Sequence, residues 1–98
     1  MAQEEDLDRA AKERRLKAIM ATPDGRAWMW DHLAECGVFR SSYVSNSLDM
    51  SFNEGSRNVG LRLLADLHEF AFEEFQQMER EARATKEIEV ENELDETE

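Results

Sequence analysis

The stretch GVFRSSYVSNSLDMSFNEGSRNVG, residues 37–60, interrupts a chain that is otherwise rich in charge and in helix-forming residues. It holds three of the four glycines, the only tyrosine, two phenylalanines and two arginines, and it has no lysine. Its first part, residues 38–51, has no sustained hydrophobic period and is rich in Ser and Asn, which predicts a loop. Connections in small helical domains usually have about 2–8 residues, so a loop of this length is typical of a functional segment.

A third helix is predicted to follow this loop. Ser51 and Glu54 have the spacing of a capping box, which places the helix start there and lets the helix continue to about Leu67. Gly55 and Gly60 each cost such a helix about 1 kcal/mol relative to alanine. A close approach by another backbone at one of the two glycines would offset that cost. The side chains expected to be buried on this helix are Phe52, Val59, Leu63, Leu64 and Leu67.

Two helices are predicted before the loop. Residues 6–20 are strong helix formers, and the second helix spans about Pro23–Cys36. Thr22 and Pro23 suit the cap and the first position of that second helix, and Gly37 suits the residue just beyond its end. The apolar side chains expected to face a core are Leu16, Ile19 and Met20 on the first helix and Ala27, Trp30, Leu33 and Ala34 on the second.

A fourth helix is predicted after the third, over about Phe72–Ala84. Its apolar residues recur at helical spacing, whereas residues 85–98 alternate acids with occasional aliphatics and offer no such stripe. We therefore expect an acidic disordered tail over residues 85–98. The stripe of the fourth helix comprises Ala71, Phe75, Met78 and Ala82.

The expected fold class is all-α, with three or four helices, an ordered loop over residues 37–53 and the disordered acidic tail. A chain of 98 residues suits one small domain. We divide it into a charged N-terminal helix at 1–20, a helical domain at 21–84 and the tail at 85–98. The single cysteine fits a reducing compartment, the first residues have no secretory pattern, and no apolar run could span a bilayer.

The net charge of −11 is unevenly distributed along the chain. Residues 1–20 hold equal numbers of acids and bases, and residues 85–98 hold seven acids and one base. The only bases between residues 21 and 65 are arginines. A duplex-DNA binder normally needs a basic face to displace counterions from phosphates, so this distribution makes nucleic acid an unlikely partner.

No catalytic or cofactor site emerges from the spacing of reactive residues. Gly55 and Gly60 have the spacing of a phosphate loop, but Leu61 and Arg62 stand where that motif needs Lys and Ser or Thr. His32 and Cys36 could share a metal, yet a structural zinc site normally needs four ligands. The serines of the loop have no evident general base. We expect a protein without a cofactor or a metal, and not an enzyme.

Arginines and aromatic residues gather in the central stretch. Arginine among aromatics is the composition of protein-interface hot spots and also of grooves that stack single-stranded nucleic acid. A structural alternative is that Arg57 ties the loop to the third helix through carbonyl or carboxylate groups. The candidate interaction residues are Phe39, Arg40, Tyr43, Asn46, Arg57, Asn58 and Arg62.

Three segments of the chain resemble a known family. ATPDGRAWMW at 21–30, CGVFRSSYVSNS at 36–47 and FNEGSRNVGLRLLADL at 52–67 are similar, in this order, to small proteins of tailed bacteriophages, mostly podophages. The family is named from a Bordetella podophage and occurs among virion-structure genes. The positions that match its signature are Gly37, Val38, Phe39, Arg40, Asn46, Glu54, Gly55, Arg57, Asn58 and Gly60.

The resemblance implies a non-enzymatic structural or assembly protein of a phage, near the portal vertex or among internal proteins. Its partners would be other phage proteins, with a homo-oligomer as a further expectation, and it would act in the host cytoplasm or in the virion. The alternative is an acidic phage protein that inhibits a host nucleic-acid-binding enzyme. Family members commonly have an Asp-Pro break before the last helix, whereas this chain has Phe70, Ala71 and Phe72 there. That difference leaves open whether the third and fourth helices are separate.

Overall fold

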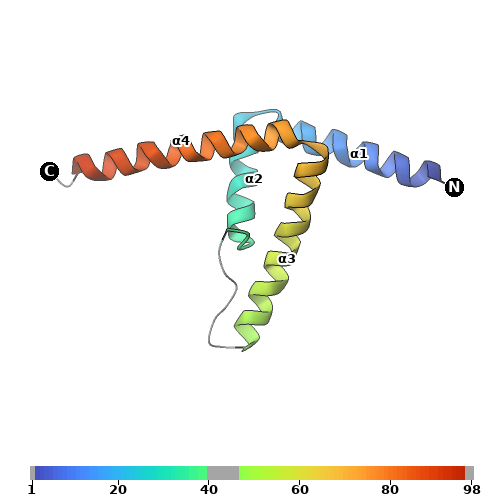
Figure 1. Ribbon diagram of the computed structural model, residues 1–98, viewed down its shortest axis with the longest axis horizontal. Coiled ribbons are helices and arrows are strands. Elements are labelled where there is room, and N and C mark those ends of the chain that lie inside the picture. The colour runs from blue at the N-terminus through green and yellow to red at the C-terminus, as the bar shows by residue number, and fades with distance from the viewer. Residues whose placement is uncertain (1, 40–46, 97–98) are drawn as a thin grey trace.

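The computed structural model describes residues 2–39 and 47–96, and these form four helices and no strand (Figure 1). The fold class is therefore all-α, as predicted. None of the four helices has the length and apolar composition needed to cross a membrane. The helices are α1 (Ala2–Met20), α2 (Pro23–Glu35), α3 (Ser47–Phe70) and α4 (Phe72–Glu96).

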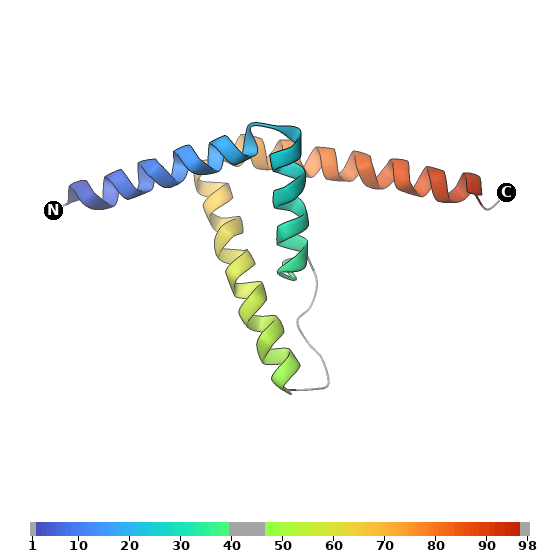
Figure 2. The ribbon, with the colours of Figure 1, turned by 180° about the vertical axis from the view of Figure 1, so that it is seen from behind.

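The four helices converge in a central hub. The first turns of α1 and the last turns of α4 project from this hub and are called the arms. α1 and α4 lie along the long axis of the molecule and point to opposite ends, while α2 and α3 descend side by side from the middle (Figures 1 and 2). The molecule measures 65 × 38 × 15 Å, so it is thin in one direction. Both the first turns of α1 and the last turns of α4 extend away from the other helices.

α2 begins and ends as its sequence predicts. The Thr22 hydroxyl accepts a hydrogen bond from the Gly25 amide at 3.0 Å, and Pro23 occupies the first turn. At the other end Gly37 has a positive φ of 82°. The Gly37 and Val38 amides donate to the Ala34 and Leu33 carbonyls, which is the hydrogen-bond pattern of a Schellman cap.

Gly60 allows the end of α2 to approach α3 closely. A Cβ at Gly60 would lie 2.5 Å from Cγ2 of Val38 and 2.7 Å from Cβ of Cys36. Gly60 is buried, whereas Gly55 is exposed and has no neighbouring atom within 4 Å of its Cβ position. The close approach expected at one of the two glycines thus occurs at Gly60, where the nearest atoms belong to the side chains of Val38 and Cys36 and not to their backbone. Both glycines lie inside α3, so this segment forms a helix and no phosphate loop.

We expect Gly60→Ala to destabilise the fold by about 1–3 kcal/mol, because the new methyl group would overlap Val38 and Cys36. Gly55→Ala is the matched control on the same helix, and it should stabilise by up to about 1 kcal/mol through helix propensity alone. Urea unfolding of both variants measures the difference. Equal effects of the two substitutions would contradict the close contact at Gly60.

A break of one residue separates α3 from α4, which answers the question left open by the sequence. Ala71 lies at a sharp corner between the two helices and is 1% exposed (Figure 1). Its amide donates to the Leu67 carbonyl and its carbonyl accepts from the Phe75 amide, both at 2.9 Å. The small side chain lets the neighbouring helices meet at this point.

The core lies where the four helices converge. Met20, Leu33 and Leu67 have no exposed surface, and they come from three different helices. Five predicted core residues are wrong: Ile19, Phe52 and Val59 are 40, 73 and 49% exposed, and Ala27 and Ala34 are also exposed. Gly60 and Leu67 lie on the side of α3 that faces α2 and the core. Phe52 and Val59 lie on a different side of the helix. The complete buried cluster is Leu16, Met20, Met29, Leu33, Leu67, Ala71, Phe75 and Met78.

Two predicted boundaries are also wrong. α3 begins at Ser47, so residues 47–53 are helical instead of belonging to the loop, and residues 40–46 lie outside the described residues. The predicted disordered tail is helical, because α4 continues to Glu96. Glu, Lys, Ala and Arg are strong helix formers, and a helix that is already nucleated by packing extends through such residues at little cost.

Candidate interaction surface

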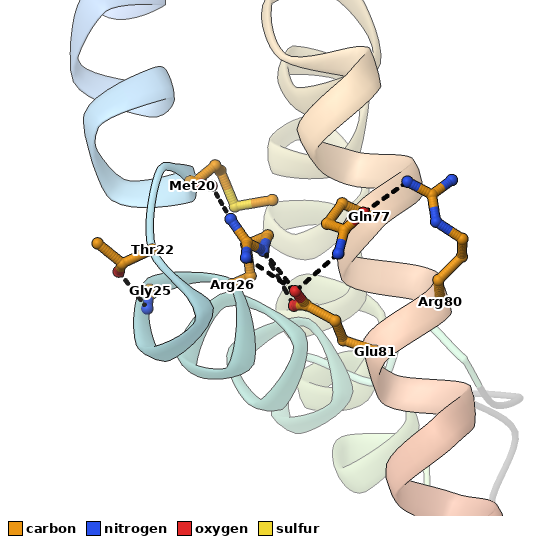
Figure 3. A network of polar contacts seen from close by, with 7 residues as sticks. All are labelled: Met20, Thr22, Gly25, Arg26, Gln77, Arg80 and Glu81. Atoms are coloured by element: carbon orange, nitrogen blue, oxygen red, sulfur yellow. Dashed lines mark hydrogen bonds and ion pairs between the residues drawn. The ribbon is translucent and has the colours of Figure 1, made fainter.

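Arg26 joins three of the four helices at the centre of the hub (Figure 3). Its Nε and Nη2 donate to the Glu81 carboxylate of α4 at 2.8–3.1 Å, which is a bidentate ion pair. Its Nη1 donates to the Met20 carbonyl at the end of α1, at 2.9 Å. The Arg26 side chain is 12% exposed, so the pair is mostly shielded from water. Arg26 therefore fixes the orientation of α2 relative to both α1 and α4.

The hydrogen bonds from Arg26 are the main cause that lowers the pKa of Glu81, and the hydrogen bond from the Gln77 amide nitrogen is the second. The same contact with Glu81 raises the pKa of Arg26. Arg80 donates to Gln77 at 2.6 Å and so extends the network along α4 (Figure 3). The charged form of Glu81 is thus favoured in the folded protein.

The lowered pKa of Glu81 predicts a pH dependence of stability. A carboxyl whose pKa is lower in the folded than in the unfolded chain stabilises the fold above its unfolded pKa, and it loses this contribution as the pH falls through the folded pKa. The melting temperature should therefore fall on acidification below about pH 5. Glu81→Gln should lower the melting temperature at neutral pH and make this acid decline shallower. An unchanged decline in the variant would show that Glu81 does not contribute.

A second set of charged contacts holds α1 on α3. Arg9 pairs with Glu69, and its guanidinium lies 5.1 Å from the centre of the Phe70 ring. Lys12 lies 3.4 Å from Asp66. These pairs are largely exposed and each contributes little free energy. They nonetheless show which face of α1 turns toward α3, and the opposite face of α1 carries Leu7, which is 69% exposed.

The structure places only some of the predicted interaction residues. Arg40, Tyr43 and Asn46 lie outside the described residues. Asn58 and Arg62 are exposed and, four residues apart on α3, share one face.

Arg57 lies on a different side of α3 from these two residues and is half-buried. Its Nε is buried without a hydrogen-bond partner among the described residues. A buried unpaired donor costs free energy, so Arg57 needs an acceptor from outside this part of the chain.

Two aromatic residues of α2 each take part in a stacked pair of rings. Phe39 stacks on Trp30 with ring centroids 4.5 Å apart, and Phe39 remains 49% exposed. Trp28 stacks on His32 at 5.0 Å and is 57% exposed. His32, considered above as a metal ligand, therefore contacts an aromatic ring, while Cys36 lies beside Gly60 as a free thiol.

A groove of about 940 Å³ lies between the first turns of α2 and the middle of α4. Its apolar residues are contributed by both helices, and acids outnumber bases among its lining residues. The Arg26–Glu81 pair forms part of its wall. The apolar lining residues are Ala27, Trp30, Met78 and Ala82.

Sequence reasoning missed both the groove and the Arg26–Glu81 pair. Arg26 and Glu81 are 55 residues apart, so no local pattern connects them. The one available signal was that Arg26 lies in ATPDGRAWMW, residues 21–30, the first of the three segments that resemble the family.

These features define a class of protein: a small all-α hub with charged helical arms and exposed apolar side chains. The chain belongs to the Bbp19-like phage protein family, whose family model matches residues 16–80. It is therefore a phage protein, as the resemblance indicated. No curated protein and no solved structure matches the chain.

The matched region coincides with the hub. All eight residues of the buried cluster lie between Leu16 and Met78, inside the matched residues 16–80. Arg26 also lies inside the match, and its partner Glu81 follows directly after its end. The family similarity thus covers the part of the chain that packs together, whereas most of α1 and the end of α4 lie outside it.

Proposed function

We propose that this protein is a non-enzymatic structural or assembly protein of a phage that acts by binding other phage proteins. The observation that carries the proposal is the exposure of large apolar side chains on every helix. Exposed apolar area of this extent on a small protein is typical of an interaction surface. The most exposed of these side chains are Leu7, Trp28, Phe52, Ile88 and Leu94.

The shape of the molecule supports the same proposal. Residues 84–96 of α4 are helical, and those with described side chains, 84–94, are all exposed. Isolated helices shorter than about 12–15 residues are marginal in water, so an arm of this length is suited to gain stability from a partner. The unpaired Nε of Arg57 and the exposed Phe39 offer further contacts at the other end of the hub.

Mass spectrometry of purified phage particles and of assembly intermediates tests this proposal. We expect the protein in a fixed stoichiometry with at least one other phage protein in particles or in intermediates isolated from the host cytoplasm. Absence from both would contradict it.

A second candidate function is inhibition of a host nucleic-acid-binding enzyme, and one observation favours it. Residues 85–96 form a helix that carries six acids and one base. Such a helix presents negative charge in a regular array that could compete with nucleic acid for a basic surface. The protein would then act through α4 instead of through the hub.

Removal of residues 85–98 distinguishes the two functions. Inhibitory binding should disappear in the truncated chain and should depend steeply on salt in the full chain. Incorporation into particles should persist at least in part, through the exposed apolar side chains that remain on α1, α2 and α3, and it should depend little on salt.

A further inference from the structure

We propose that two copies of the chain form a closed two-fold dimer, in which the outer face of α1 of each copy lies in the groove between α2 and α4 of the other. The inference deepens the proposed function by naming one partner, a second copy of this chain. The inference rests on the proposed function only in the shared requirement for a protein-binding surface. The experiment that tests the inference is independent of the experiment that tests the function.

The first element of the contact is the outer face of α1. Leu7, Ala11, Arg14 and Ala18 are spaced i, i+4, i+7 and i+11, so they share one side of the helix. This side is opposite Leu16, which faces the core. Leu7, Arg14 and Ala18 are exposed. The small alanines would let another helix approach closely.

This outer face carries arginines that form no ion pair with the described residues of their own chain. Arg14 lies on it, Arg15 lies beside it, and both are exposed without an ion-pair partner among the described residues. The bases of the inner face are different, because Arg9 and Lys12 pair with Glu69 and Asp66 on α3. α1 thus binds its own hub with one side, and on the other it presents apolar side chains, two arginines and one acid, Glu4.

The second element is the groove, which has the complementary composition. Its lining combines apolar residues of both helices with four acids outside the Arg26–Glu81 pair, against the two bases Arg83 and Lys86. A partly apolar lining with a net negative charge suits a helix that presents small apolar residues flanked by arginine. The four acids are Asp24, Asp31, Glu79 and Glu89.

The arrangement of the arms makes the contact intermolecular and symmetric. α1 and α4 point to opposite ends of the long axis (Figures 1 and 2). Because the groove is lined by α2 and α4, the α1 arm of a chain extends away from the groove of the same chain. A two-fold rotation about an axis across the middle of the molecule places the α1 arm of one copy alongside α4 of the other. The same rotation also places α1 of the second copy in the groove of the first. Both copies then have their α1 face and their groove occupied, so the dimer is closed.

Charge also limits where two copies can meet. Each chain carries a net charge of −11, so random contacts between copies are repulsive. The outer face of α1 against the groove juxtaposes arginine with acid in both halves of the interface. A self-contact between the ends of α4 would instead oppose two helices with six acids each in residues 85–96.

Charge reversal in the full chain tests the proposal. We would make R14E/R15E in one variant and D31K/E79K in another, and measure molar mass by sedimentation equilibrium. The wild type should have twice the 11.4 kDa mass of one chain. Each variant alone should dimerise at least about tenfold more weakly, since like charges then face each other in both contacts.

Mixing the two variants provides the decisive measurement. In a mixed dimer the glutamates of one α1 face the lysines of the other groove, and the reciprocal contact is the wild-type pair. The mixture should therefore recover dimers close to the wild-type affinity. Arg62→Glu, an exposed reversal on α3, is the matched control for R14E and should leave dimerisation unchanged. Circular dichroism confirms that each variant folds.

Three results would overturn the inference: a monomeric wild type, dimers that resist both reversals, or a mixture that stays monomeric. A molar mass of the wild type above that of a dimer would overturn the closed two-fold arrangement. If dimerisation fails any of these tests while the protein is still recovered with phage proteins, the inference falls and the proposed function stands. If the protein is absent from particles and intermediates but dimerises as described, the proposed function falls and the inference of a dimer stands.

Discussion

Gly25→Ala is expected to destabilise the protein by about 3 kcal/mol or more, which corresponds to a loss of roughly 12 °C or more in melting temperature. A Cβ at residue 25 would lie 1.7 Å from the carbonyl oxygen of Ile19 and 2.9 Å from its carbonyl carbon. Both are backbone atoms in the last turn of α1, so no side-chain rotation relieves the overlap. α2 would have to move away from α1.

That movement would disturb the contacts on which the hub depends. The Gly25 amide donates to Thr22, and the next residue, Arg26, bonds to the Met20 carbonyl and to Glu81. A shift of the first turn of α2 therefore strains the helix cap and the ion pair together. This explains in physical terms why glycine precedes arginine in the TPDGR segment.

Thermal unfolding followed by circular dichroism measures the loss. Gly55→Ala serves as the control, because it makes the same change in an exposed helical position with open space around it. If both alanine variants melt at or above the wild-type temperature, α1 and α2 do not meet as described at Gly25.

Helix boundaries marked by capping residues, proline or glycine could be predicted from the sequence. α2 has a Thr22 cap, Pro23 at its start and Gly37 beyond its end, and each of these acts locally. The spacing of Ala71, Phe75 and Met78 likewise predicted which side of α4 is buried. Local hydrogen bonds determine the ends of α2, and a single helical period determines the buried side of α4, so both could be predicted from the sequence.

The incorrect boundaries arose where a local signal was weak. A Ser-x-x-Glu pattern also occurs inside helices, so it did not mark the start of α3, which lies one turn earlier at Ser47. The acidic end of α4 was predicted as disordered because it has few apolar residues. Helix propagation from a packed segment needs no apolar face, so α4 continues through it.

The candidate surface was predictable only in part, because its decisive contacts join distant residues. Composition drew attention to Phe39, which is exposed and stacks on Trp30, and to Arg57, whose Nε has no hydrogen-bond partner in the described part of the chain. The Arg26–Glu81 pair and the groove instead depend on how α2 crosses α4. Close packing at Gly25 joins α2 to α1, and close packing at Gly60 joins the end of α2 to α3, so these contacts also link distant parts of the chain. No single stretch of sequence contains these contacts.

Leu33→Ala should cost about 2–5 kcal/mol, because the substitution removes a side chain that has no exposed surface and leaves a cavity where the helices converge. The loss is a large fraction of the stability of a small domain, which is typically about 5–15 kcal/mol. Among the residues whose side chains the structure describes, only four others of this size are as completely buried, so few neighbours can move to fill the space. The Leu33 carbonyl also accepts the Val38 amide in the cap of α2, and that bond is retained in the variant.

Urea unfolding should place the midpoint of Leu33→Ala well below that of the wild type, with a similar slope. Ile88→Ala is the matched control: Ile88 is 58% exposed on the α4 arm, so its truncation should change the stability by less than about 0.5 kcal/mol. The contrast separates the hub from the arms, because the apolar residues of the hub hold the fold while those of the arms remain available to partners. Equal costs for Leu33 and Ile88 would mean that the arm is packed in solution, and the division of the chain into hub and arms would then be wrong.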